Sequence, residues 1–338
     1  MTAPGVNFAH LIALSDEIGT FEHARFAVPR REHGYCTDDV ARVVVVLARE
    51  GATSGPLREL FARSLDFLAQ AQHADGRCRN RRDSHGRWSG DWTVEDCWGR
   101  LLWGAGIAAA RAGDESERDR ALDLFERGAQ VRSPWSRATA FAALGAFEVL
   151  RRDPSHQSAR SLLSDALVRL SGPWGGREWR WPEVRLTYAN AALAQAQLEA
   201  AWVLGRDEHV ERALVELEWL LGVESSATYL SVTPVGGRGP GERGPGFDQQ
   251  PIEVAALADA CASAWRLTGD RRWREGMEMA VGWFAGANDV GVAMYDIATG
   301  GGYDGLTQNG PNLNQGAEST LALLATLQHA RLLEGVAS

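Results

Sequence analysis

Apolar residues recur along this chain with the 3.6-residue period of amphipathic α-helices, and patterns that indicate strands are confined to a few short runs. The apolar stripes and the breaker residues between them predict twelve helices. Their expected ranges are 6–18, 37–50, 56–73, 93–112, 115–129, 134–152, 156–170, 187–204, 207–222, 251–268, 271–286 and 316–333. The pattern therefore predicts an all-α protein.

The connections between these helices alternate in length. Short turns follow the even-numbered helices, and those at 111–114, 203–207 and 267–270 place glycine at a helix C-terminus before an aspartate that caps the next helix. Apart from the brief 130–133, the connections that lead into even-numbered helices are long: 19–36, 74–92, 171–186, 223–250 and 287–315. This alternation indicates a repeat of six helical hairpins.

Six hairpins form either an open superhelix or a closed toroid. An open solenoid has repeats of nearly constant length, whereas the turn residues Asp114, Asp153, Asp207 and Asp270 are separated by 39, 54 and 63 positions. Because the variation lies in the long connections, which emerge at one end, we predict a single-domain (α/α)6 barrel over residues 1–338 with a cleft beneath those loops. Runs at 229–232 and 293–296 predict short β-hairpins on this rim.

Charge and composition exclude several classes of function. A net charge of −9 and a pI near 5.5 argue against a nucleic-acid or anionic-membrane partner. All 35 basic residues are arginines, so Schiff-base chemistry, a lysine-held pyridoxal cofactor and a Walker-type phosphate loop are excluded. The glycine-rich stretch 236–246 has no strand before it and is expected to be a loop.

Cysteine and histidine spacing predicts neither a metal site nor a cofactor. The four cysteines lack CxxC spacing and the eight histidines lack paired ligand spacing, so the thiols are expected to be free and buried. No GxSxG elbow is present. The N-terminus does not resemble a signal peptide, and no apolar run reaches membrane-spanning length. We therefore expect a cytoplasmic protein.

The even-numbered helices begin with acids, amides and aromatic residues, whereas the odd-numbered helices begin with ordinary charged segments such as 115–118. The candidate catalytic acids and bases are the carboxyl groups at these entrances: Asp38, Asp39, Glu95, Asp96, Glu253 and Glu318. Helix capping is the competing interpretation, since Thr93 and Asp96 have the spacing of a capping box. For Glu253 and Glu318 a catalytic role is favoured over helix capping. Their apolar neighbours should turn that side of the helix inward, where a carboxylate needs partners.

Thirteen tryptophans are many for this length, and tryptophan is both a platform for sugar rings and a filler of wide helical cores. Amides and arginine at the same entrances are suited to hydrogen bonding with hydroxyl groups, although Asn190 and Asn314 could equally cap helices. The candidate substrate-binding residues are Arg42, Trp92, Trp98, Trp181, Tyr188, Asn190, Asp248, Gln249, Gln250, Asn314 and Gln315.

Three segments, 33–42, 247–251 and 314–320, resemble bacterial six-hairpin α/α-barrel proteins of carbohydrate metabolism. Such domains occur alone or fused behind glycosyltransferases and form a glycosyltransferase-associated helical family. The resemblance implies a saccharide ligand and a possible glycosyltransferase partner. A more distant likeness, in architecture only, is to α/α-barrel glycosidases such as the unsaturated glucuronyl hydrolases.

The leading hypothesis is an inverting glycoside hydrolase acting on an oligosaccharide or glycoside, with two carboxyl groups roughly 6.5–9.5 Å apart. Asp38 or Asp39 and Glu95 or Asp96 are candidates for one of these groups, and Glu253 or Glu318 for the other. A sugar epimerase or isomerase is an alternative, although the histidines avoid the helix entrances. A non-catalytic saccharide-binding partner of a glycosyltransferase is another. A terpene cyclase, which needs an apolar cavity, is the least supported.

Overall fold

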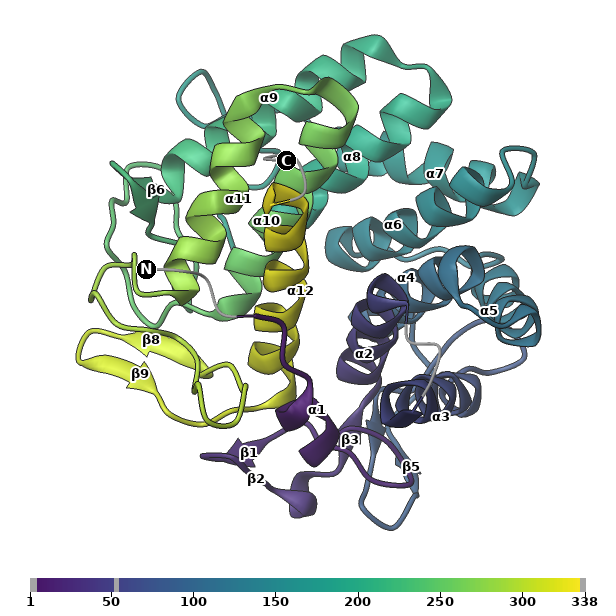
Figure 1. The fold of residues 1–338 in the computed structure, drawn as a ribbon. Coiled ribbons are helices and arrows are strands. Elements are labelled where there is room, and N and C mark those ends of the chain that lie inside the picture. The colour runs from purple at the N-terminus through teal and green to yellow at the C-terminus, as the bar shows by residue number, and fades with distance from the viewer. Residues whose placement is uncertain (1–4, 52–54, 335–338) are drawn as a thin grey trace.

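The computed structural model describes residues 5–51 and 55–334 (Figure 1). Within them, twelve α-helices occur, as predicted: α1 Ala9–Ala13, α2 Thr37–Glu50, α3 Gly55–Ala71, α4 Asp96–Arg111, α5 Glu115–Gly128, α6 Ser136–Arg152, α7 Gln157–Leu170, α8 Asn190–Leu204, α9 Asp207–Val223, α10 Pro251–Thr268, α11 Arg271–Phe284 and α12 Ala317–Glu334. A short 3-10 helix spans Arg31–His33. No helix in these ranges is long and apolar enough to cross a membrane.

The even-numbered helices form a closed inner ring in which each contacts the next and α12 contacts α2 (Figure 1). The other helices lie outside this ring, where α3, α5, α7, α9 and α11 pack against the inner helices that precede them in the chain. The fold is therefore the predicted (α/α)6 barrel. Its alternation of short turns and long connections places the N-terminal ends of all six inner helices at one end of the barrel.

Glycines explain why α4 and α6 lie so close together. A Cβ atom added to Gly106 would collide with the carbonyl oxygen of Gly145, and one added to Gly145 would collide with that of Leu102. A Cβ atom on Gly99 would meet the carbonyl oxygen of Ala138 in the same way. The small residues let the two backbones touch, so this pair forms a rigid part of the wall.

The predicted starts of α1, α4 and α8 are each three residues too early, and for α4 and α8 local contacts give the reason. Helix α4 begins at Asp96 because Thr93 exchanges both backbone hydrogen bonds with Cys78, at 2.8 and 3.0 Å, and so is held in extended structure. The predicted capping box of Thr93 and Asp96 is therefore absent. Helix α8 begins at Asn190, whose side chain accepts a hydrogen bond from the N–H group of Thr187.

The first helix is also shorter than the predicted 6–18. It ends at Ala13 because Asp16 accepts hydrogen bonds from the N–H groups of Ile18 and Gly19, which form a turn there.

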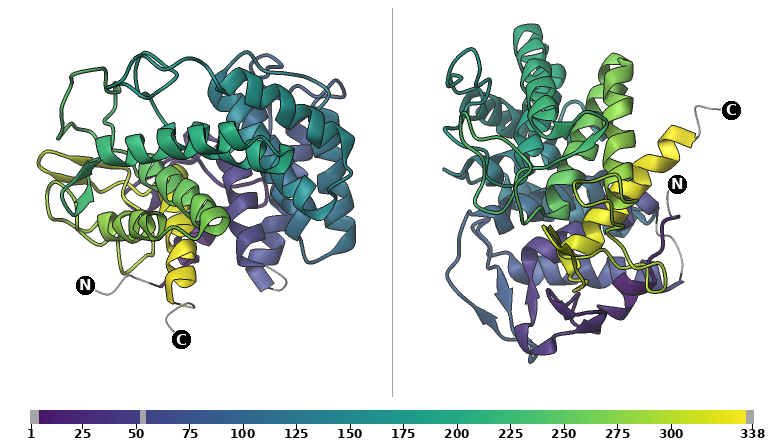
Figure 2. Two further views of the ribbon diagram at one scale, coloured as in Figure 1. Left: turned by 90° about the horizontal axis from the view of Figure 1, so that it is seen from above. Right: turned by 90° about the vertical axis from the view of Figure 1, so that its left-hand side faces the viewer.

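The long connections gather at the end of the barrel opposite the C-terminal end of α12 (Figure 2). They carry short antiparallel strand pairs: β1 (Ala24–Arg25) with β2 (Val28–Pro29), β3 (Tyr35–Cys36) with β4 (Arg81–Arg82) and β5 (Trp88–Ser89), β6 (Ser225–Ser226) with β7 (Tyr229–Leu230), and β8 (Gly305–Thr307) with β9 (Gly310–Asn312). The hairpin predicted at 229–232 is present as β6–β7. At 293–296 the described residues form only an isolated bridge between Tyr295 and Gly302.

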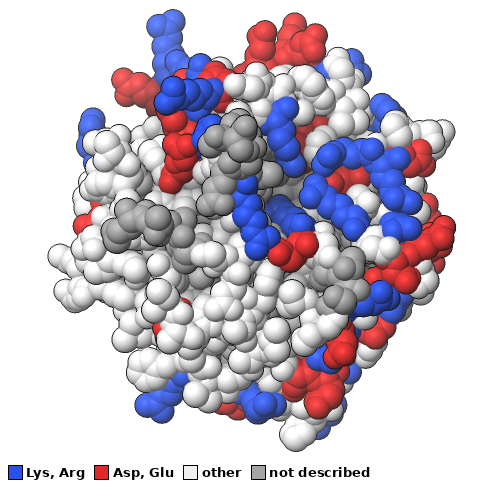
Figure 3. Space-filling model, in the orientation of Figure 1, with Lys and Arg blue, Asp and Glu red and all other residues white. Residues whose placement is uncertain are grey.

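The other end of the barrel, which faces the viewer in Figures 1 and 3, is closed by buried ion pairs. Asp259 of α10 accepts two hydrogen bonds from Arg49 of α2, at 2.7 and 2.9 Å, and one from His329 of α12, at 2.5 Å. Glu148 of α6 accepts hydrogen bonds from Arg111 of α4. These contacts join inner helices that are far apart in the sequence.

Candidate active site

The first turns of α2, α4, α10 and α12 surround a pocket of about 430 Å³ beneath the long loops. Among the described residues, its lining includes seven carboxyl side chains, of which some come from helix entrances and others from loops: Glu22, Asp38, Asp39, Asp96, Asp248, Asp304 and Glu318. Three arginines, Arg42, Arg81 and Arg100, line it as well. The pocket is therefore acidic and rich in hydrogen-bonding groups.

Asp39 and Glu318 are joined by Arg42, one turn into α2. Its guanidinium donates to Asp39 and, at 2.6 Å, to Glu318. Asp39 is 2% exposed and also accepts a hydrogen bond of 3.1 Å from the Cys36 thiol. Burial raises the pKa of Asp39 to about 6, although Arg42 opposes the rise. The side chain of Glu318 is 42% exposed, so part of its carboxylate faces the pocket.

Among the carboxyl groups that line the pocket, Asp38 is the one with a buried oxygen that accepts no hydrogen bond from the described residues. Its Oδ2 accepts a hydrogen bond of 2.8 Å from Asn80, whereas its buried Oδ1 has no hydrogen-bond partner among the described residues and lies 3.5 Å from Arg100. Burial raises the pKa of Asp38 against the opposing charges of Arg100 and Arg42, and Asp96 adds to the rise. A carboxyl group in this setting is suited to hold a proton and to donate it.

A second chamber of about 680 Å³ adjoins the pocket, between the entrances of α4, α6 and α8. Asp38, Asp96 and Tyr188 line both spaces and so mark their junction. The Tyr188 hydroxyl donates a hydrogen bond of 2.6 Å to Asp96, and the Tyr188 side chain remains 41% exposed. Glu95, which was predicted with Asp96, lines only the second chamber, together with Trp135.

Below the pocket the barrel narrows. The space beyond Arg42 and Glu318 is only about 50 Å³ and is lined largely by apolar side chains such as Trp103, Phe141 and Ile252. The space large enough for a small molecule therefore lies above Arg42, beside the carboxyl groups of the helix entrances.

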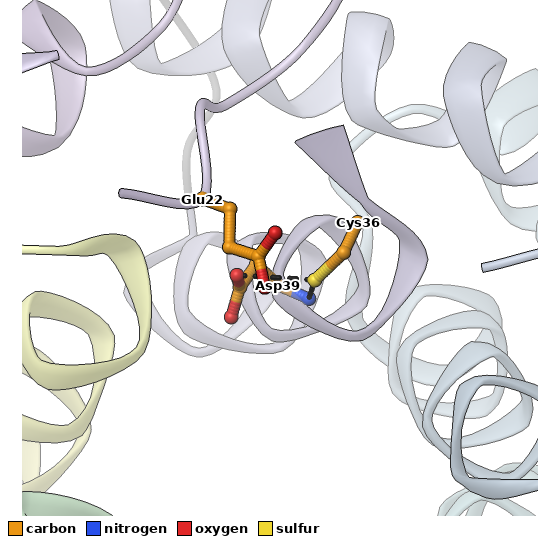
Figure 4. A group of neighbouring side chains, drawn as sticks. All are labelled: Glu22, Cys36 and Asp39. Atoms are coloured by element: carbon orange, nitrogen blue, oxygen red, sulfur yellow. Dashed lines mark hydrogen bonds between the residues drawn. The ribbon is translucent and has the colours of Figure 1, made fainter. Parts of the chain in front are cut away.

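Glu22, Cys36 and Asp39 form the tightest group of potential metal ligands in the described residues, with one ligand atom from each within 4.8 Å of the others (Figure 4). Arg81 pairs with Glu22 and Arg42 pairs with Asp39, so the negative charges already have cationic partners. Burial raises the pKa of the Cys36 thiol well above its ordinary value, which keeps it protonated. This donor set fits an ion-pair cluster better than a metal site.

Glu253 lies outside both spaces. Its carboxylate, 3% exposed, accepts hydrogen bonds from the N–H groups of Ala189 and Asn190 and from the Asn190 side chain. Ala189 has a left-handed backbone with φ of 44°, which this carboxylate helps to hold. Burial and Glu224 raise the pKa of Glu253 to about 8. Glu253 and Asn190 are thus hydrogen-bonded to each other beneath the start of α8.

The predicted aromatic residues divide in the same way. Tyr188 faces the cleft, whereas Trp98 and Trp181 are at most 1% exposed and lie in the core. Trp92 packs against His73 and beneath the guanidinium of Arg79, outside the lining of either space. Periodicity alone did not separate a core tryptophan from one in the cleft.

The predicted amides are also divided. Asp248 and Gln250 line the pocket. Gln249 is buried, where it donates to Asp289 at 2.6 Å and accepts from the Trp283 indole, and Gln315 bonds to Thr299 and Asp296. Asn314 accepts a hydrogen bond from the Phe26 N–H group. These last three residues hold the loops in place around the pocket.

Several pocket residues carried no signal in the sequence. Glu22, Arg81 and Asp304 lie in the long connections and reach the pocket through tertiary folding. Asp304 accepts hydrogen bonds from the Gly316 N–H group at 2.7 Å and from the Ser319 hydroxyl at 2.5 Å. His23, in the same lining, was predicted to lie away from the entrances.

Comparison with known proteins supports the fold. No family model and no curated protein sequence matches the chain. A sugar epimerase from a ruminal bacterium is similar in structure, with a TM-score of 0.73, 11% identity, and coverage of 96% of this chain and 95% of that one. The cellobiose 2-epimerase of Bacillus thermoamylovorans has a TM-score of 0.71 at 10% identity, covering 95% of each chain.

The cellulase Cel9M of C. cellulolyticium, solved in complex with cellobiose, is also similar. Its TM-score is 0.63 at 9% identity, and the match covers 94% of this chain and 88% of that one. At such identities the likeness concerns the fold alone. The chain thus has the same six-hairpin (α/α)6-barrel fold as these epimerases and this cellulase.

Proposed function

We propose that this protein is a carbohydrate-active enzyme and that it hydrolyses glycosidic bonds with Asp38 as general acid and Glu318 as general base. The observation that carries the proposal is the state of Asp38 at the junction of the two chambers. A glycosidic bond joins two sugar units, so a proton donor to that bond belongs between the spaces that hold them. The raised pKa of Asp38 fits that task, and so does its Oδ1, which accepts no hydrogen bond from the described residues and lies 3.5 Å from Arg100.

Glu318 supplies the second carboxylate from α12, on the other side of Arg42. Arg42 donates a hydrogen bond to one of its oxygens, and the 42% exposure of its side chain leaves room for a water molecule. In an inverting hydrolase one carboxyl group protonates the leaving oxygen and the other activates a water molecule, and we assign these two roles to Asp38 and Glu318. Asp39 accepts hydrogen bonds from both Arg42 and Cys36, and we propose that its role is to position Arg42.

The remaining polar groups of the pocket would bind hydroxyl groups. Asp248, Gln250 and Asn312 line the pocket and offer both acceptors and donors. Asp96, which already accepts from the Tyr188 hydroxyl, offers further acceptor positions at the junction. A terpene cyclase needs an apolar cavity, so this polar lining argues against that function.

The experiment is to incubate the protein with a panel of oligosaccharides and to follow the products by chromatography and NMR. Asp38→Asn and Glu318→Gln should each lower kcat by at least about a hundredfold, in the range lost with a general acid or base. Asp83→Asn, which changes an exposed acid of the loop 74–92 that pairs with Arg87, is the control. If both site variants keep activity within about tenfold of wild type, the acid–base assignment is wrong.

Epimerisation or isomerisation of a sugar is the second candidate. It is favoured by the fold shared with two epimerases and by His23, which lines the pocket 3.7 Å from Glu22. If the product has the mass of the substrate and an altered sugar configuration, the reaction is epimerisation or isomerisation and not hydrolysis. His23→Asn should then abolish turnover, whereas a hydrolase with the assignment above should keep most of its activity.

A non-catalytic role as the saccharide-binding partner of a glycosyltransferase makes a different prediction. Calorimetry would then show oligosaccharide binding without turnover, and Asp38→Asn would change affinity only slightly. Co-purification with a glycosyltransferase would support that partner.

A further inference from the structure

The second chamber contains a large aromatic side chain with no evident structural task. Trp135 is 57% exposed, although tryptophan is highly buried on average. Its backbone N–H donates to the Ser133 hydroxyl at 3.1 Å, and it stands at the N-cap of α6, so its position is fixed by the helix. With the half-exposed Tyr188 at the junction, the chamber presents two aromatic rings along its length. Exposed rings on a rigid wall are suited to stack on sugar rings.

The arginines that line the second chamber are already paired. Arg137 lies in a buried ion pair with Glu183, and Arg185 donates to Glu242 at 2.8 and 2.9 Å. Among the described residues, Glu95 has no arginine partner in this chamber, and neither does Asp96 at the junction. An anionic sugar would therefore bring its charge toward unpaired carboxylates without meeting a free cation.

The two spaces are each as large as an ordinary small-molecule site, and they meet at Asp96 and Tyr188. We propose that the cleft binds a linear, uncharged oligosaccharide that runs from the pocket past Asp96 and Tyr188 into the second chamber, where Trp135 stacks on a distal sugar unit. This inference rests on the saccharide pocket proposed above and adds the length and the charge of its ligand.

The test measures binding by calorimetry in the Asp38→Asn protein, which keeps the shape of the carboxyl group and prevents turnover. The probes are α-1,4- and β-1,4-linked glucose and β-1,4-linked mannose oligosaccharides of two and six units, and an oligogalacturonate of six units. At least one neutral six-unit probe should bind about tenfold more tightly than its disaccharide. The oligogalacturonate should bind at least about tenfold more weakly than that probe.

Trp135→Ala should lower the affinity for the six-unit probe about tenfold and leave the disaccharide within about twofold. Trp135→Phe should restore most of the loss, because it keeps an aromatic face. Trp202→Ala is the matched control, since Trp202 is 50% exposed but lies on α8 outside both spaces. It should change neither affinity.

The proposal is overturned if no neutral six-unit probe binds more tightly than its disaccharide. It is also overturned if Trp135→Ala weakens both lengths equally, or if the oligogalacturonate binds as tightly as the neutral probes. Absence of hydrolysis by the wild type, with length-dependent binding retained, would refute the proposed reaction and leave this inference standing. Turnover of disaccharides, with no effect of Trp135→Ala on the binding of the six-unit probe, would support the proposed reaction and refute this inference.

Discussion

Replacement of Asp259 by alanine should destabilise the barrel more than any exposed charge substitution at the same end. Asp259 is 6% exposed and binds Arg49 through both carboxylate oxygens and His329 through one of them. It thereby ties α10 to α12 and, beyond it, to α2, where the ring closes. Removal of the carboxylate leaves the Arg49 guanidinium buried without its counter-charge, since the side chain of Arg49 is only 13% exposed.

The loss of one partner from a buried ion pair costs about 3–5 kcal/mol. An unfolding entropy of about 2.1 cal/mol/K per residue gives roughly 0.7 kcal/mol/K for 338 residues. The melting temperature should therefore fall by about 4–7 °C, as measured by circular dichroism or calorimetry at pH 7. Arg331→Gln is the control, because Arg331 is half exposed and pairs with Glu50 at the surface, where a pair is worth about 0–1 kcal/mol.

The pH dependence follows from the same contacts. Burial pushes the pKa of Asp259 upward, but Arg49 and His329 outweigh it and hold that pKa well below the usual range. A carboxyl group with a depressed pKa stabilises the fold fully above its unfolded pKa of about 3.9 and loses this effect as the pH falls. The difference between wild type and Asp259→Ala should therefore shrink below about pH 4.

A melting temperature within about 1 °C of wild type would refute this reasoning. A second variant separates an uncompensated charge from a simple loss of packing. In Arg49→Met/Asp259→Leu both charges are removed and apolar volume is kept, so stability should recover by at least half. If the double variant is as unstable as Asp259→Ala, the buried charge is not the cause.

Three further results are expected. Burial raises the pKa of Glu199 to about 7, so the folded protein retains a proton that the unfolded chain releases above about pH 4.3. The free energy of unfolding should therefore fall as the pH rises from 5 to 8. In Glu199→Gln this fall should be smaller, as measured by urea unfolding. Tyr188→Phe removes the hydrogen bond to Asp96 and should raise KM for oligosaccharides roughly three- to tenfold with an unchanged melting curve. Gly106→Val should unfold the protein at a much lower temperature or prevent folding, because its Cβ would overlap the backbone of Gly145, whereas Gly222→Val on α9, where an added Cβ meets no atom, should be tolerated far better.

The outer helices were predictable here because each carries an apolar stripe, whereas inner helices such as α8 and α10 are buried on nearly every side and showed themselves as long, mainly apolar runs without breakers. The first-turn position of Asp38 and of Glu318 followed from that pattern and from the alternation of connection lengths. The long loops carry no such period, so the sequence did not show that Asp304 would reach the α12 entrance or that Glu22 would meet Arg81. Their positions depend on strand pairs such as β8–β9 and on hydrogen bonds between residues far apart in the chain.

The partners of buried groups were equally hidden. The sequence indicated correctly that Glu253 needs partners, but these are the N–H groups of Ala189 and Asn190, more than sixty positions earlier. Trp181 looked like a stacking residue because it precedes a helix entrance, yet it packs against Trp219 in the core. The type of a residue and its distance from a helix start do not show whether its side chain points into the pocket or into the core of the barrel.

Helix dipoles favour acids at the pocket end of the barrel. The six inner helices point the same way, so the partial positive charge of their N-termini favours first-turn acids such as Asp38 and Glu318, and their C-termini favour last-turn arginines such as Arg49 and Arg266. An acid in a first turn is therefore expected on physical grounds alone. What distinguishes Asp38 from Asp39 and Glu253 is that a buried oxygen of Asp38 has no donor among the described residues, while theirs are occupied. Arg100 lies 3.5 Å from this oxygen without donating a hydrogen bond, and Asp38 lines both spaces, so a bound ligand can supply the missing donor. Glu224 also has a buried oxygen without a donor but lines neither space, and this is the physical reason for placing the chemistry at Asp38.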